Sequence, residues 1–216
     1  MGAKEQAELV KKTVARVRVV PVIKLEDPEQ AVPLGEALTR AGLPIAEVTF
    51  RTAAAADGIR AMRAACPGVV VCAGSLATRE QALEAYVAGA MFFVSAGFSP
   101  KIADVADEKE IPYYAGCCTP TEILMAVDRG YDVVKFFPAK PMGGVETIKM
   151  LSGPFPGLKF MPTGGINAGN LKESLSCDKV LACGGSWMVN PKLMAEGHWD
   201  EIERLSREAV SLAREA

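Results

Sequence analysis

One lysine inside an apolar run is the residue of this chain that most strongly suggests covalent chemistry. Lys135 lies in the segment Val133–Pro138 and has apolar residues on both sides. Burial disfavours the charged form of a lysine, and the neutral amine is the form that attacks a carbonyl carbon. The alternative is a lysine on an edge strand, whose head group reaches water along an apolar surface. The run alone leaves both interpretations open.

A second chemical pattern is the alternation of Glu47, Thr49 and Arg51. Side chains two residues apart lie on the same face of a strand, so these three are expected to point the same way. Glu47 has apolar neighbours and therefore needs a partner, either as a carboxylate that moves protons or in a structural ion pair with Arg51. Both roles fit the spacing.

Small and hydroxyl-bearing residues follow one predicted strand after another. Glycine lets backbone N–H groups approach a ligand closely, and hydroxyl groups add further donors. Parallel barrels commonly hold a phosphate at the loops after their seventh and eighth strands, where this chain has two glycine pairs. These segments are Cys72–Ser75, Ser95–Gly97, Ala115–Pro120, Pro162–Asn167 and Cys183–Trp187.

The elements that would position these residues alternate between β-rich runs and helical patterns. We predict strands at Val17–Lys24, Ile45–Phe50, Val69–Ala73, Phe92–Ser95, Ile111–Ala115, Val133–Phe137, Lys159–Pro162 and Val180–Cys183. The predicted helices are Ala3–Val17, Pro28–Ala41, Ala53–Cys66, Arg79–Ala88, Lys101–Glu108, Pro120–Arg129, Val145–Leu151, Ala168–Leu175 and Trp199–Arg214. Eight strands separated by helices predict an α/β protein, a (β/α)8 TIM barrel with an additional N-terminal helix.

The main structural rival is a doubly wound open sheet, but no G-x-G-x-x-G follows the first strand. We see no linker or charge block, so residues 1–216 are expected to form a single domain. Lys159 is a local rival to Lys135, but it stands near the start of its strand, which is the end that serves stability in a barrel. Lys24 is expected to act as an anion contact or to be exposed.

Composition excludes several functional classes. The chain has 24 basic and 26 acidic residues and a formal charge of −2, so it lacks the basic footprint of a nucleic-acid-binding protein. It has no apolar stretch of membrane-spanning length and no apolar signal core, and a cytoplasmic location is expected. It has one histidine, so no histidine-based metal site is expected. We also expect no cofactor. The six cysteines are expected to be reduced thiols.

Taken together, these motifs resemble the 2-keto-3-deoxy-6-phosphogluconate (KDPG) aldolases, which also act as 4-hydroxy-2-oxoglutarate (KHG) aldolases. The resemblance extends from about Val19 to Trp187 and depends on the order and spacing of the segments together. These segments are Val20–Ile23, Glu47–Thr52, Thr119–Glu122, Val134–Ala139, Gly153–Phe155, Pro162–Ile166 and Gly184–Trp187.

The resemblance implies a class I aldolase on a (β/α)8 barrel, usually a homotrimer, that uses no metal. Its substrates would be small keto acids and aldehydes. Lys135 would form the Schiff base, and Glu47 would transfer protons. The keto acid carboxylate would be bound by Arg51, Ser75 and Thr163. A distal phosphate would be bound by Gly164, Gly165, Gly184, Gly185 and Ser186.

Some residues depart from the family pattern. The family commonly has Gly-Ala-Gly-Thr where this chain has the segment from Cys72 to Ser75, and prolines where it has Ala96 and Ala115. Cys72 and Cys117 are expected to add volume near the mouth of the barrel. Two other functions remain open: a sugar-phosphate isomerase or epimerase that uses Glu47 as its base, and a non-catalytic assembly subunit.

Overall fold

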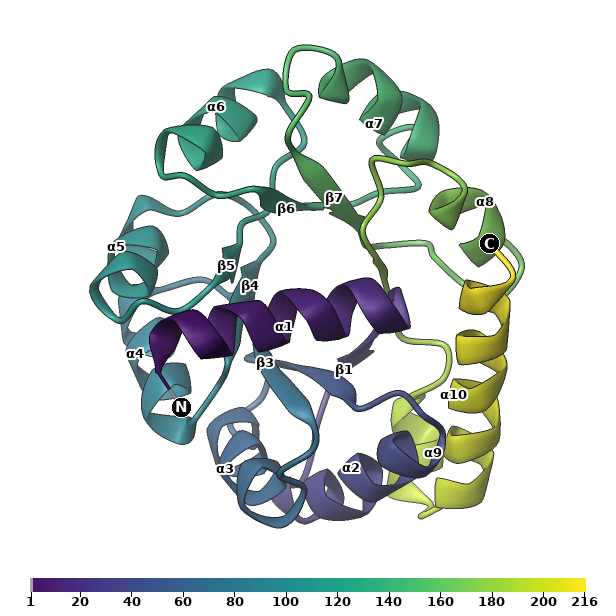
Figure 1. Ribbon diagram of the computed structural model, residues 1–216. Helices are drawn as coiled ribbons and strands as arrows, with labels where there is room; N and C mark the ends of the chain where they lie inside the picture. The colour runs from purple at the N-terminus through teal and green to yellow at the C-terminus, as the bar shows by residue number, and fades with distance from the viewer. Residues whose placement is uncertain (1) are drawn as a thin grey trace.

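The computed structural model describes residues 2–216, which form an α/β fold with parallel strands at the centre and helices around them (Figure 1). The strands are β1 (Val19–Ile23), β2 (Ile45–Thr49), β3 (Val70–Leu76), β4 (Phe92–Ser95), β5 (Tyr113–Tyr114), β6 (Val133–Phe136), β7 (Lys159–Pro162) and β8 (Cys183–Gly185). The helices are α1 (Ala3–Val17), the 3-10 helix η1 (Pro28–Gln30), α2 (Ala31–Arg40), α3 (Ala55–Ala65), α4 (Arg79–Ala88), α5 (Pro100–Glu108), α6 (Pro120–Asp128), α7 (Gly144–Ser152), α8 (Leu171–Leu175), α9 (Pro191–Ala195) and α10 (Trp199–Arg214).

Six strands form one curved parallel sheet in the order β5-β4-β3-β2-β1-β8, and β6 pairs with β7 in a second parallel sheet. Single bridges join the two sheets at both ends. On one side Gly116, just after β5, bridges to Lys135 of β6, and on the other side Thr163, just after β7, bridges to Gly184 of β8. Buried apolar side chains from both sheets and from the surrounding helices form one continuous hydrophobic core.

The helix α1 lies across one end of this ring of strands (Figure 1). Its apolar stripe of Val10, Val14 and Val17 is buried, as expected for residues at helical spacing that face the core. The side chain of Gln6 donates to the carbonyl of Met91, just before β4, and Lys11 pairs with Asp132, just before β6. Since both contacts lie where strands begin, α1 covers the end of the sheet opposite to the carboxyl ends of the strands.

Some predicted boundaries were wrong. Val17 ends α1 and does not begin β1, because Arg18 adopts φ 56° and closes the helix. The strand predicted at Val180–Cys183 instead runs over Cys183–Gly185, where β1 offers a ladder of partners, while Val180 makes one bridge to Phe160. The glycines of β8 had suggested a loop by composition.

Other elements differ in length. The fifth predicted strand shrinks to the two residues of β5, and the eighth predicted helix shortens to α8. The short helix α9 was not predicted; it begins with a proline directly after the capping side chain of Asn190, which accepts from the N–H of Lys192. Within residues 2–216, no helix has both the length and the apolar character needed to cross a membrane.

Candidate active site

An ion pair inside the ring of strands is the centre of the candidate site. Lys135 Nζ of β6 lies 3.2 Å from Glu47 Oε1 of β2, and the two residues are 88 positions apart in the sequence. Glu47 is fully buried, and Lys135 is 4% exposed. Taking two charges out of water is costly, and the cost is repaid only by close contact between them. The buried Lys135 amine and Glu47 carboxylate therefore depend on each other, because either charge alone would be costly to bury.

The two side chains reach each other because both point into the interior of the ring. Alternation along β6 puts Val134 and Phe136 on the opposite face from Lys135, and all three residues are buried. The Nζ atom of Lys135 also lies 5.5 Å from the centroid of the Phe137 ring, within range of a cation–π contact. Glu47 Oε2 has no hydrogen-bond partner among residues 2–216, so this oxygen is free to accept a proton.

A cavity of about 260 Å³ opens over Lys135 at the carboxyl ends of the strands. It brings together the predicted site residues from five different strands and the loops that follow them, and only Glu47 lies behind its wall. The lining residues are Val22, Arg51, Ser75, Ala96, Lys135, Phe137, Thr163, Gly164, Gly165, Ile166, Gly184, Gly185 and Ser186.

Arg51 and Ser75 form one side of this cavity. The Arg51 Nε atom donates to Thr49 Oγ1 at 3.0 Å, and Thr49 in turn donates to the carbonyl of Ile23 at 2.7 Å. This chain of bonds orients the guanidinium at the mouth. Ser75 has φ 55°, an uncommon backbone for a residue other than glycine, at an irregularity in the pairing of β3 with β4. Such bulges re-aim side chains, and here the re-aimed hydroxyl lines the cavity.

The glycines after β7 and within β8 form the other side. Gly164 and Gly165 have φ 98° and 81°, a left-handed backbone that glycine adopts without strain. At Gly184 an added Cβ would lie 3.2 Å from Cβ and 3.0 Å from Cγ2 of Thr163, so the missing side chain makes room for that threonine. Thr163 is 6% exposed and is one of the residues that line the cavity. The backbone thus comes close to the space where a ligand would lie.

Several alternatives from the sequence are contradicted. Glu47 pairs with Lys135, and in the part of the chain that the structure describes it makes no ion pair with Arg51. Lys159, at the first residue of β7, donates its Nζ to the carbonyl of Asp178 at 2.6 Å, far from the cavity's lining residues. Lys24 pairs with Glu26 at 2.5 Å and is partly exposed. Lys135 is therefore the lysine that faces the cavity.

The cysteines lie deeper than the sequence suggested. Cys72 is fully buried in β3, level with Glu47 in the register, and Cys117 is almost fully buried. Burial and the nearby carboxylate of Glu47 hold the pKa of the Cys72 thiol well above its usual value. Burial raises the pKa of Cys117 to about 12. Since the thiolate is the nucleophilic form, neither thiol competes with Lys135 for an electrophile.

Sequence reasoning missed the apolar wall of the site. Val22, Phe137 and Ile166 line the cavity with the polar residues. Phe137 and Ile166 lie inside the segments Val133–Pro138 and Pro162–Asn167, so their place next to the polar candidates was a usable signal. Val22 lies in the resemblance segment Val20–Ile23 but looks like any other residue of a buried strand. Among residues 2–216, no group of three or more His, Cys, Asp or Glu side chains is placed to hold a metal ion.

Comparison with known proteins bears on what this arrangement does. A sequence model described as KDPG and KHG aldolase matches residues 10–205. A Haemophilus influenzae protein named 2-dehydro-3-deoxy-phosphogluconate aldolase is 42% identical over 92% of this chain and 93% of its own length. A KHG/KDPG aldolase of Escherichia coli is 40% identical over 91% of this chain and 92% of its own.

A solved structure is also similar. The KDPG aldolase of Legionella pneumophila, with pyruvate captured as a covalent carbinolamine intermediate, superposes with a TM-score of 0.87 at 35% identity. The match covers 91% of this chain and 96% of the Legionella chain.

Proposed function

The chain belongs to the KDPG and KHG aldolase family, and on this premise we propose that it is a class I aldolase whose Schiff base forms on Lys135. It cleaves KDPG to pyruvate and glyceraldehyde 3-phosphate, and 4-hydroxy-2-oxoglutarate to pyruvate and glyoxylate. The observation that carries the proposal is the buried Lys135 amine, which faces the cavity and lies 3.2 Å from Glu47 Oε1. The relatives named above are aldolases, which favours this function over an isomerase or an assembly subunit.

The reaction begins with a proton transfer along the contact between Lys135 and Glu47, which leaves the amine uncharged. The amine attacks the C2 carbonyl of the keto acid, and Glu47 then gives its proton to the C2 hydroxyl, which leaves as water. The resulting iminium ion draws electrons from the C3–C4 bond, and Glu47 is again a carboxylate. Glu47, as a carboxylate, takes the proton of the C4 hydroxyl, the C3–C4 bond breaks, and the aldehyde leaves. The remaining enamine takes a proton at C3 from Glu47, and water then releases pyruvate and the free amine.

The cavity supplies separate groups for the two ends of the substrate. Arg51, held by Thr49, and the hydroxyls of Ser75 and Thr163 bind the carboxylate beside the reacting carbonyl. The backbone of the two glycine pairs and the Ser186 hydroxyl bind the distal phosphate, consistent with where barrels hold phosphate groups. Holding both ends fixes the C2 carbonyl near Lys135 Nζ, which replaces a chance encounter by an oriented attack.

We further propose that residues 1–216 form one domain in which the two sheets act as one closed (β/α)8 barrel. The bridges from Gly116 to Lys135 and from Thr163 to Gly184 support this closure, since they continue the parallel order from β5 to β6 and from β7 to β8. Two backbone bonds strengthen the first junction: Lys135 N–H donates to Ala115 at 2.9 Å, and Cys117 N–H donates to Lys135 at 2.8 Å. Closure places the amine between β5 and β7.

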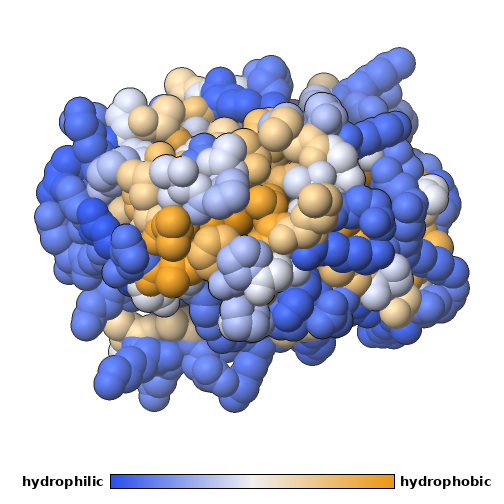
Figure 2. All heavy atoms as spheres, turned by 90° about the horizontal axis from the view of Figure 1, so that it is seen from above, coloured by the Kyte–Doolittle hydropathy of each residue, from blue (hydrophilic) through white to orange (hydrophobic). Residues whose placement is uncertain are grey.

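The assembly we propose is a homotrimer, located in the cytoplasm. The six free cysteines are consistent with a reducing compartment. A face of α6 and α7 that we call the apolar face supports self-association, because large apolar side chains gather there in the open. Figure 2, which looks down on the side where α6 and α7 lie in Figure 1, shows these side chains. The apolar face comprises Leu124, Met125 and Val127 of α6, Met150 of α7, and Met142 in the turn before α7.

Reductive trapping tests the proposed function directly. Incubation with pyruvate and borohydride should attach a three-carbon adduct to the peptide that contains Lys135, as read by peptide mass spectrometry. The variant Lys135→Met should give no adduct, while Lys159→Gln should be trapped like the parent chain. An adduct on Lys159 or Lys24, or none at all, would refute the assignment.

A further inference from the structure

One glycine of β3 has no backbone reason to be a glycine. Gly74 lies in β3 opposite Thr49 of β2, and its φ is outside the left-handed region that favours glycine. An alanine would therefore adopt the same backbone without strain. The reason for a glycine has to be sought in what surrounds the position.

The space beside Gly74 is filled by the carboxylate of Glu47. A Cβ added at Gly74 would lie 2.5 Å from Glu47 Cγ and 2.8 Å from Cδ, and closer still to Oε1. Real Cβ atoms essentially never come within 3.0 Å of such neighbours, and these three atoms are the nearest ones to that Cβ. The Glu47 carboxylate therefore occupies the space that a side chain at position 74 would take.

The register between β2 and β3 explains how the Glu47 carboxylate reaches the space beside Gly74. Glu47 pairs with Cys72, which is two residues before Gly74 on the same face of β3. Strand side chains lean along the strand direction, and the long Glu47 side chain passes the level of Cys72 and places its carboxylate at the level of Gly74. The buried Cys72 side chain occupies the level below, and the carboxylate points toward Lys135, with Oε1 3.2 Å from Nζ.

We infer that Gly74 is a positioning residue for the aldol reaction, which sets the place of the Glu47 carboxylate relative to Lys135 Nζ and the bound substrate. The inference rests on the proposed function, since it assigns Gly74 to the proton-transfer step of that reaction. Gly74 itself touches no substrate and acts through Glu47.

The direct test is Gly74→Ala. The methyl group displaces the carboxylate, and a displacement of about 1 Å at a catalytic group can cost about 10²-fold in rate. We expect kcat to fall by about this factor while KM changes little, because Arg51 and the glycine loops are untouched. The exchange of pyruvate methyl protons in D2O, read by NMR, should slow in parallel, because Glu47 carries that proton.

A matched control is Gly68→Ala. Gly68 lies in the turn before the same strand, its φ is also outside the left-handed region, and within the described chain an added Cβ there meets nothing within 4 Å. This variant should keep the parent kcat. A Gly74→Ala enzyme with the parent kcat and exchange rate would overturn the inference.

A double-mutant cycle of melting temperatures shows whether Gly74→Ala destabilises the fold through its contact with Glu47 or by disturbing the strand in general. It does not depend on activity. The background Glu47→Ala with Lys135→Met removes both charges of the pair, so no buried charge is left alone. Gly74→Ala should lower the melting temperature of the parent chain but leave that of this background unchanged. If Gly74→Ala lowers the melting temperature equally in both backgrounds, the inference is overturned. If Gly74→Ala fails to fold in the parent chain, the inference is overturned when it also fails to fold in the double-variant background.

Failure of the proposed function would look different. If the parent chain forms no borohydride adduct with pyruvate, the aldolase assignment fails whatever Gly74 does. If the parent is trapped at Lys135 and Glu47→Gln is slow, but Gly74→Ala is fast, only the positioning role fails.

Discussion

Lys135 and Glu47 depend on each other for more than catalysis. In a buried ion pair, removing one partner costs roughly 3–5 kcal/mol because the other charge is left without compensation. Glu47 Oε1 holds the amine, and Oε2 has no partner within residues 2–216, so the role of counter-ion and the proposed role of proton acceptor fall on one carboxylate. A test of its chemistry therefore needs a substitution that keeps the shape of the side chain.

Glu47→Gln is that substitution. The amide retains an oxygen that accepts from Lys135 but cannot carry a proton through the reaction, and loss of a general acid/base typically costs 10²–10⁴-fold. We expect a fall of about that size in pyruvate release from KDPG, measured with a coupled lactate dehydrogenase assay. A turnover equal to that of the parent chain would reduce Glu47 to a structural counter-ion.

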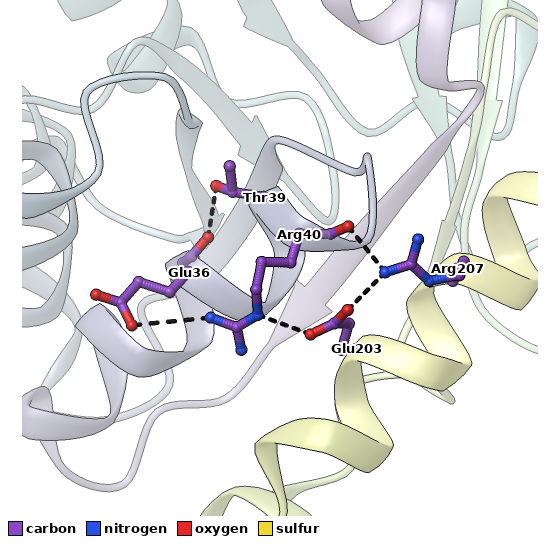
Figure 3. Close-up of polar contacts among 6 residues, drawn as sticks. Glu36, Thr39, Arg40, Glu203 and Arg207 are labelled. Carbon is purple, nitrogen blue, oxygen red and sulfur yellow. Dashed lines mark hydrogen bonds and ion pairs between the residues drawn. The ribbon is translucent and has the colours of Figure 1, made fainter.

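At the scale of elements, α10 is joined to α2 by a cluster of ion pairs (Figure 3). Glu203 of α10 accepts from Arg40 Nε of α2 at 2.7 Å and from Arg207 at 2.5 Å, and Arg207 also donates to the Arg40 carbonyl. Under these ion pairs, apolar residues of α10 such as Ile202 pack on the barrel wall. Arg40 and Glu203 thus hold the last helix against the one that follows β1.

This cluster predicts a pH dependence of stability. The hydrogen bonds from Arg40 and Arg207 lower the pKa of Glu203 from its ordinary value of 4.5. A carboxylate with a lowered pKa stabilises the fold above its ordinary pKa, and that contribution disappears as the pH falls through the lowered value. The melting temperature of Glu203→Gln should therefore lie below that of the parent chain at pH 7, and the two should converge as the pH falls below the ordinary value and through the lowered one.

A matched control for that comparison is Glu84→Gln. Glu84 is exposed on α4 and makes no ion pair among the residues described. It should shift the melting curve little at either pH. A Glu203→Gln difference that stays constant down to pH 3 would contradict the assigned cause.

At the scale of the whole molecule, the two ends of the barrel have different tasks. The end covered by α1 is closed by helix contacts such as that of Gln6 with Met91, whereas the cavity over Lys135 opens at the other end. The apolar face lies on the side of the molecule where α6 and α7 lie (Figures 1 and 2), and none of its residues lines the cavity. In the proposed trimer, assembly and catalysis therefore use different residues.

The proposed trimer can be tested on the apolar face. Met150 is 81% exposed on α7, and a charge placed there would have to lose water if the face is covered by another subunit. Met150→Glu should therefore shift the species seen by analytical ultracentrifugation from trimer toward monomer. Val87→Glu is the control, since Val87 is 76% exposed on α4, away from α6 and α7. An unchanged mass for Met150→Glu would exclude this face from the interface.

The local pattern of residues was sufficient to predict much of this protein. Short β-rich runs marked most strands and helical patterns marked most helices, and the lone lysine of the run Val133–Pro138 marked the residue that faces the cavity. The glycine pairs after β7 and in β8 marked its rim. These predictions succeed because periodicity decides which face a side chain occupies, and that depends only on nearby residues.

Only the tertiary structure determined which side chains of different strands contact one another. Whether Glu47 would pair with Arg51 or with Lys135 depends on how the strands bring Glu47 Oε1 of β2 within 3.2 Å of Lys135 Nζ of β6, and no local spacing encodes that distance. The φ of Ser75 and the contact of Gly74 with Glu47 have the same origin, since each depends on packing between neighbouring strands. Residue spacing determines which face of a strand a side chain occupies, whereas the distance between side chains of different strands depends on how the two sheets pack together.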